Sequence, residues 1–355
     1  MKQPSLSNIL PYLASIAAFY LATVSYFYPE LLDNKTLAQT DIVQFEGMSR
    51  QSVAYRAETG KQTLWNDAMF AGLPDYLIAT GVPEEALGAV RSLFRGFIDV
   101  DASAHLLMLH LTSFWVLLLS FRVNPWLALA GALAWAFSSY NIINIDAGHF
   151  TKNWAVAYSA LVLGGLNFVF RGRTWLGLGV FAFGLAVQIG APHYQITFYL
   201  FWVCLAFTIS EFVQAMQAGQ HGGFIKKVLV LVLGVVLAGS TAVARLWMTQ
   251  EYTPYSIRGA AVLTPDDESV QGAQGLDKNY AFSWSQGKLE TLTLLIPRFY
   301  GGGSNEQLTK NSALYQTLEQ RFGAQQAQRL QNAGPIVPLY HGDQPFTVGP
   351  FYAGA

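Results

Sequence analysis

The chain has 355 residues, of which 52% are hydrophobic and only 12% are charged, and its formal net charge is −1. Soluble domains carry about 25% charged residues, so this composition argues against an ordinary soluble protein. Nor does the near-neutral charge indicate a nucleic-acid partner. With a mean hydropathy of +0.29, the composition predicts a multi-pass membrane protein.

Apolar segments recur along the chain, and a segment of roughly 17–25 residues is long enough to cross a bilayer. Several contain Gly or Pro, which membrane helices tolerate where neighbouring groups satisfy the freed backbone. Together they predict an all-α polytopic membrane protein, with the lipid bilayer as its main partner. We place the seven segments at residues 9–28, 104–121, 126–145, 152–170, 174–190, 194–214 and 224–247.

The basic residues of the short loops predict the orientation, because Lys and Arg collect on the cytoplasmic side. With the N-terminus inside, Arg122, Arg171, Arg173, Lys226 and Lys227 also lie inside. The loop 29–103 and the region after the last segment then lie outside. Since the first segment has no convincing small-residue cleavage site, we interpret it as an uncleaved anchor.

Four regions follow from this topology. Residues 1–28 form the anchor, and residues 29–103 form a large first extracytoplasmic loop with amphipathic stretches such as Leu87–Phe97. Residues 104–247 form the helical bundle. Residues 248–355 are polar, with a helix expected at Asn311–Gln331. The last residues show neither a helix stop nor a charged tail, so we expect further spans beyond this sequence.

Polar residues cluster where the segments meet the predicted outer face. Because ionisable groups at membrane depth are costly and usually face a cavity, we expect these residues to share one pocket. They are Asp41 in the first loop; His149 and Lys152 between the third and fourth segments; His193 and Gln195 between the fifth and sixth; and Arg258 after the seventh.

Such a pocket suits sugar transfer from a polyprenyl-phosphate donor. A carboxylate is needed to take the acceptor proton, and Asp41 fits that role. Cations or helix N-termini must hold the departing phosphate, a role that fits His149, Lys152 and Arg258. The alternatives are that Asp41 caps a helix beginning at Ile42, and that the basic residues reach to water from the interface.

The sequence predicts no cofactor. Two isolated histidines, His149 and His193, with scattered acids lack the close spacing of a structural metal site. A divalent metal is therefore the less favoured hypothesis.

Several short segments resemble, in order, the bacterial YfhO family of membrane proteins. The resemblance covers the chain from about residue 41 to its end. The segments are Asp41–Gln44, Trp65–Pro74, Gly148–Lys152, His193–Tyr199, Tyr255–Gly259, Gly275–Ser285, Glu290–Pro297 with Gly301 and Gly302, and Tyr340–Pro345.

This resemblance implies a GT-C type fold in the bacterial cytoplasmic membrane. It implies transfer of a sugar from an undecaprenyl-phosphate carrier to a cell-envelope glycan on the extracytoplasmic face. Asp41 matches the first-loop acid proposed as catalytic base, and His149 and Lys152 match a family motif. Family members usually continue well beyond this length.

Two other functions were weighed. A non-catalytic GT-C-like accessory subunit of a larger membrane complex would keep the fold without the chemistry, and the first loop lacks a tight acidic pair. A transporter is the least favoured, because the apolar segments hold almost no ionisable residues at mid-depth, where coupling-ion sites lie.

Overall fold

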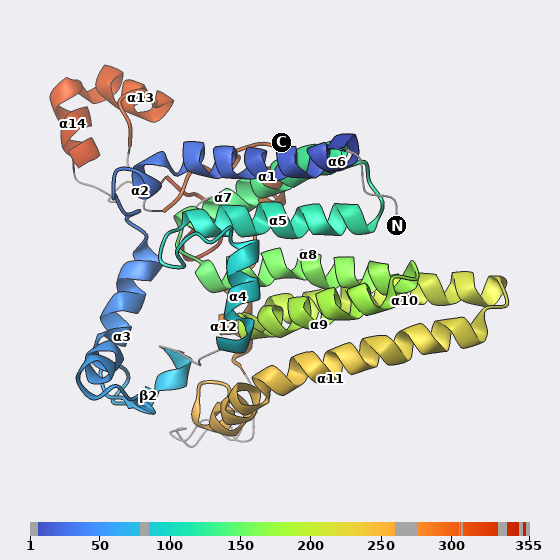
Figure 1. Ribbon diagram of the computed structural model, residues 1–355. Helices are drawn as coiled ribbons and strands as arrows, with labels where there is room; N and C mark the ends of the chain where they lie inside the picture. Colours follow the sequence, from blue (N-terminus) through green and yellow to red (C-terminus); the bar gives the residue numbers. More distant parts are fainter. Residues whose placement is uncertain are drawn as a thin grey trace. The chain divides into compact units, whose positions relative to one another are not determined.

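The computed structural model describes residues 6–78, 85–259, 276–304, 306, 308–332, 339–347 and 351–352. Within these residues the structure is mostly helical with almost no sheet, which confirms the all-α prediction (Figure 1). The sheet in this part of the chain has two short antiparallel strands, β1 (Trp65–Asn66) and β2 (Leu73–Pro74). The chain divides into two compact units, residues 1–137 with 144–249, and residues 138–143 with 250–355.

The first unit contains the apolar helices and the first loop. The short α7 continues from the second unit into the first. The helices are α1 (Leu6–Tyr26), α2 (Tyr28–Leu31), α3 (Thr40–Thr59), η1 (Asp75–Leu77), α4 (Glu85–Phe94), α5 (Ala104–Ser120), α6 (Pro125–Ala136), α7 (Ser139–Asp146), α8 (Phe150–Phe170), α9 (Thr174–Gly190), α10 (Tyr194–Gln217) and α11 (His221–Tyr252).

All seven predicted apolar segments fall on helices. Four are long and apolar enough to cross a membrane: Asn8–Tyr26, Phe150–Phe170, Tyr194–Gln217 and His221–Tyr255. The predicted segment 126–145 is not one straight helix, because α6 and α7 meet at a bend of 48°. If this bent pair is taken as one span, it is the fifth candidate span among the described residues. The apolar α5 and α9 have 17 residues each, so a count of seven spans stays a prediction.

Glycines let α8 and α9 approach closely at the centre of the first unit. A Cβ atom on Gly165 of α8 would lie 2.3 Å from the backbone nitrogen of Phe181, and one on Gly177 of α9 would lie 2.5 Å from that of Val169. Small residues that bring backbones together are typical of helix pairs in membranes. α8, α9 and α10 consequently run side by side (Figure 1).

The first loop is fixed to the helical bundle by buried polar contacts. The carboxylate of Glu30 accepts hydrogen bonds from the backbone N–H groups of Ser103 (2.7 Å) and Ala104 (2.9 Å), where α5 begins. Those N–H groups have no partner within the helix. α4 overlaps the predicted amphipathic stretch Leu87–Phe97 and packs on the bundle through Phe94, whose ring stacks on Phe183 at 5.6 Å.

The second unit contains short helices around a buried carboxylate. Glu290 is 3% exposed and accepts a hydrogen bond from the Tyr340 hydroxyl at 2.5 Å. The helix expected at Asn311–Gln331 is two helices, because the chain turns at Gly323 with φ +84°. The elements are η2 (Thr253–Tyr255), α12 (Lys278–Phe282), η3 (Glu290–Leu294), α13 (Ala313–Phe322) and α14 (Ala324–Asn332).

Candidate functional site

The loop between α7 and α8 places His149 at the start of α8. α7 ends in a Schellman motif: the Gly148 N–H donates to the Ile145 carbonyl, and the His149 N–H donates to the Asn144 carbonyl. That motif needs a left-handed residue, which Gly148 supplies with φ +81°. α8 then begins at Phe150, with His149 as its N-cap.

The N-terminus of α3 packs directly on this loop. Gln39, the N-cap of α3, is buried and donates its amide to the Ile145 carbonyl at 2.5 Å. A Cβ on Gly148 would lie 3.1 Å from Ile42 and 3.4 Å from the Cβ of Asp41. The absence of a side chain at Gly148 therefore lets the first loop approach the α7–α8 turn.

Asp41 and His149, two of the residues that the sequence places in one pocket, contact each other where α3 packs on this loop. The Nε2 atom of His149 lies 3.1 Å from Oδ2 of Asp41, and the two side chains are 33% and 49% exposed. α3 begins at Thr40, so the alternative in which Asp41 caps a helix starting at Ile42 is wrong. Asp41 instead lies in the first turn, where the helix dipole favours a negative group.

The Asp41–His149 contact is a hydrogen bond in which the imidazole is largely neutral. Burial lowers the pKa of His149 below its ordinary 6.5, and Lys152 lowers it further, while Asp41 opposes the shift. A neutral ring with its proton on Nε2 donates to the carboxylate. Nδ1, which lies 3.2 Å from the side-chain oxygen position of Asn144, then needs a donor, so the Asn144 amide should be turned with its NH₂ toward the ring.

Lys152 and His193 belong to the same group of charges. Burial lowers the pKa of His193, and the next contributions come from Lys152 and His149, so these residues are electrostatically coupled. Lys152 lies in the first turn of α8, and His193 is the N-cap of α10. Neither helix has a side-chain cap. Two positive helix ends with added basic residues form an arrangement that favours an anion.

No protein-family model, no curated protein and no solved structure matches this chain.

The other two expected site residues, Gln195 and Arg258, make contacts within their own segments. Gln195 donates its side-chain amide to the Tyr199 hydroxyl at 2.7 Å, one turn further along α10. Arg258 lies in the second unit, where its backbone N–H donates to the Ser256 hydroxyl. Among the described residues, no three His, Cys, Asp or Glu side chains gather as a metal site.

A buried polar chain that the sequence pattern did not single out lies behind His149. His105 and His110 of α5 are both fully buried. Asn153 of α8 donates to the His149 carbonyl at 3.0 Å, and its Oδ1 lies 3.2 Å from Nε2 of His110. This contact joins α5 to the turn that carries His149.

The two buried histidines have opposite tautomers. The Asn153 amide must present its oxygen to His110, because its nitrogen donates to a backbone carbonyl. His110 therefore carries its proton on Nε2, and Nδ1 has no partner among the described residues. His105 is fully satisfied: Nδ1 donates to the Ala102 carbonyl, and Nε2 accepts from the Trp154 indole at 2.7 Å. The signal for both was two histidines within one apolar segment.

Proposed function

We propose that the chain is a GT-C type membrane glycosyltransferase, similar to the YfhO family, that moves a sugar from a polyprenyl-phosphate donor to a cell-envelope acceptor. The observation that carries the proposal is the Asp41–His149 contact, 3.1 Å long, with Lys152 and His193 coupled to it. A carboxylate and a set of basic groups at the ends of apolar helices are what this reaction requires.

Asp41 is proposed to act as the general base. It takes the proton of the acceptor hydroxyl as the hydroxyl oxygen attacks the anomeric carbon. The bond from that carbon to the donor phosphate breaks, and the phosphate leaves with the electron pair. Half of the Asp41 side chain is exposed, so an acceptor can reach it, and the hydrogen bond from His149 fixes its orientation.

The departing phosphate is proposed to bind at the start of α8 and α10. A lysine in the first turn of a helix is unfavourable beside the positive helix end, and Lys152 occupies that position. A phosphate would relieve this repulsion by accepting hydrogen bonds from Lys152 and from the backbone of both helix ends. The donor lipid would approach sideways from the bilayer, because the site lies at the ends of candidate spans.

An Asp41→Asn variant tests the proposal. We expect turnover to fall by about 100-fold or more, since general bases contribute roughly 10²–10⁴-fold. The measurement is release of undecaprenyl phosphate from undecaprenyl-phosphate hexose, in proteoliposomes containing the full-length protein. Glu46→Gln is the matched control, because it removes a carboxylate from an exposed position of the same helix. A correctly inserted Asp41→Asn protein that turns the donor over at the native rate would contradict the assignment.

A further inference from the structure

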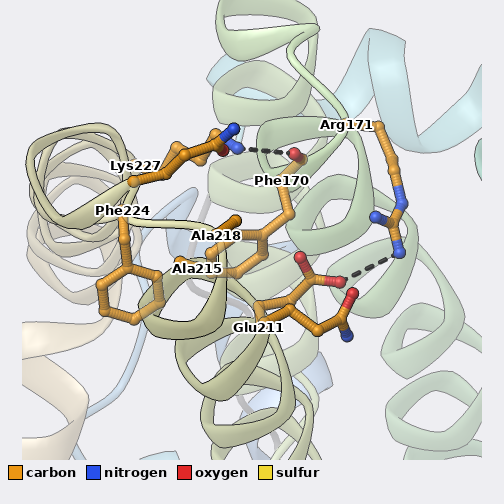
Figure 2. A pocket seen from close by; sticks show the side chains of 9 residues that line it. Phe170, Arg171, Glu211, Ala215, Ala218, Phe224 and Lys227 are labelled. Carbon is orange, nitrogen blue, oxygen red and sulfur yellow. Dashed lines mark hydrogen bonds and ion pairs between the residues drawn. The ribbon is translucent and has the colours of Figure 1, made fainter.

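A second polar pocket lies at the opposite ends of α8 and α10 from the candidate site. It has a volume of about 310 Å³, lies where α8 and α10 end and α11 begins, and includes Phe170, Arg171, Glu211, Gln214, Phe224 and Lys227 in its lining (Figure 2). The orientation predicted from the basic loops puts this end on the cytoplasmic side.

Helix ends and stacked rings shape the pocket. α8 and α10 both end in Schellman motifs, at Gly172 (φ +87°) and Gly219 (φ +68°), so the chain reverses tightly on each side. The ring of Phe224, on α11, stacks on Phe170 with 6.0 Å between centroids and 24° between planes. These two rings form an apolar wall of the pocket next to its charged residues.

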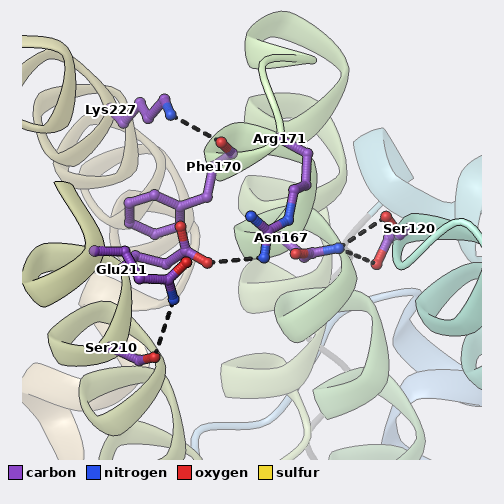
Figure 3. A network of polar contacts seen from close by, with 8 residues as sticks. Ser120, Asn167, Phe170, Arg171, Ser210, Glu211 and Lys227 are labelled. Carbon is purple, nitrogen blue, oxygen red and sulfur yellow. Dashed lines mark hydrogen bonds and ion pairs between the residues drawn. The ribbon is translucent and has the colours of Figure 1, made fainter. Parts of the chain in front are cut away.

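The charged residues leave the pocket with a net positive charge. Arg171 pairs with Glu211 at 2.9 Å (Figure 3). Lys227 donates to the Phe170 carbonyl at 2.8 Å, and within the described residues it forms no ion pair with a carboxylate. An ammonium group has three donors, so two of those on Lys227 remain for another acceptor. Behind the pocket, Asn167 holds α8 to Ser120 through its side-chain amide (Figure 3).

We propose that this pocket binds a phosphate group, supplied by the headgroup of an anionic phospholipid. The pocket combines an ammonium that has no carboxylate partner among the described residues, a guanidinium and an apolar aromatic wall at the end of candidate spans. Basic pockets between membrane helices on the cytoplasmic side bind anionic headgroups in this way. A phosphate oxygen would accept from Lys227 and from the Arg171 N–H groups that Glu211 leaves free. This inference needs the helices to cross the membrane but does not need the transferase chemistry.

The chain offers a matched pair of lysines for the test. Lys226 and Lys227 are neighbours on α11, but only Lys227 lines the pocket. In phosphatidylcholine nanodiscs with a minor fraction of phosphatidylglycerol, native mass spectrometry counts the anionic lipids retained by the protein. We expect Lys227→Gln to reduce that retention about fivefold, corresponding to about 1 kcal/mol for one basic group at an anionic headgroup, and Lys226→Gln, at a position that does not line the pocket, to reduce it clearly less.

A second variant makes the result independent of any folding defect. Glu211→Gln removes the one acid of the lining and frees Arg171, so we expect it to increase phosphatidylglycerol retention. Soluble glycerol phosphate distinguishes the two sources of the ligand: if it binds with the same dependence on Lys227 and displaces the lipid, the phosphate site stands and the lipid source is overturned. Equal losses in the Lys226 and Lys227 variants, or equal retention of phosphatidylcholine, would overturn the site itself.

Discussion

The orientation of the Asp41 carboxylate depends on a histidine, and the position of that histidine depends on a glycine. His149 holds Asp41 at 3.1 Å, and Gly148 lets the two segments approach because no side chain stands between them. Asn153 adds a contact to the His149 backbone and ties it to His110 in α5. The proposed base is thus positioned by groups that have no proposed part in the bond changes.

The shifted histidines predict that acid destabilises the protein. The pKa values of His149 and His193 are lowered, mainly by burial, so the folded protein binds fewer protons than the unfolded chain once the pH falls below about 6.5. Stability rises with pH wherever the unfolded state binds more protons. We therefore expect the unfolding temperature in detergent to be constant at higher pH and to fall as the pH drops through the ordinary histidine pKa of about 6.5.

The double variant His149→Gln with His193→Gln removes both groups and should make this profile shallower, the remaining slope coming from the fully buried His105 and His110. The change has to be followed relative to each protein's own unfolding temperature at neutral pH, since the substitutions also alter packing. A native protein that becomes more stable in acid, or a double variant with an unchanged profile, would show that these histidines are not held neutral.

Among the elements, α8 and α9 depend most on residue size. Gly177 of α9 lies against the α8 backbone, where an added Cβ would be 2.5 Å from the Val169 nitrogen. Gly179, two residues along the same helix, is exposed, and a Cβ there would have nothing within 4 Å. The same substitution at these two positions should have opposite effects.

We expect Gly177→Ala to lower stability by about 1–3 kcal/mol, the usual cost of overpacking. Gly179→Ala should raise it by up to about 0.5–1 kcal/mol, since alanine loses less backbone entropy in a helix. Chemical unfolding of the two variants in the same detergent measures the difference. Equal stability of the two proteins would mean that α8 and α9 do not pack as closely as described.

The sequence predicts the helices better than their breaks and contacts. Apolar runs locate the long apolar helices, because burial in lipid or protein demands it, but they do not locate α3, whose 20 residues are mostly polar. The bend between α6 and α7 was missed, since residues 126–145 are apolar on both sides of it. The break at Gly323 had a visible signal, a glycine within the polar helix. The sequence predicts that Asp41 and His149 lie close together. It does not predict the His110–Asn153 contact, because that contact depends on how α5 packs on α8, which no local pattern encodes.

For the whole molecule, the central prediction is that the two ends of the helices face opposite sides of the membrane. The candidate site lies at the start of α8 and α10, and the pocket lined by Arg171 and Lys227 lies where these two helices end. The proposed transfer requires the first of these ends to face outward, where a polyprenyl-linked sugar meets an envelope acceptor. This orientation still depends on the basic residues of the short loops.

Single cysteines can test that orientation, because the chain has only one native cysteine, Cys204, which lies within α10. In a Cys204→Ala background, Lys61→Cys reports on the first loop and Gly222→Cys on the first turn of α11. Lys61 is exposed, and a side chain at Gly222 has nothing within 4 Å, so neither change should disturb the fold. In spheroplasts, a membrane-impermeant maleimide should label the first at once and the second only after permeabilisation. The reverse order would put Asp41 and His149 on the cytoplasmic side, and labelling of both from outside would mean that the helices between them do not cross the bilayer an odd number of times.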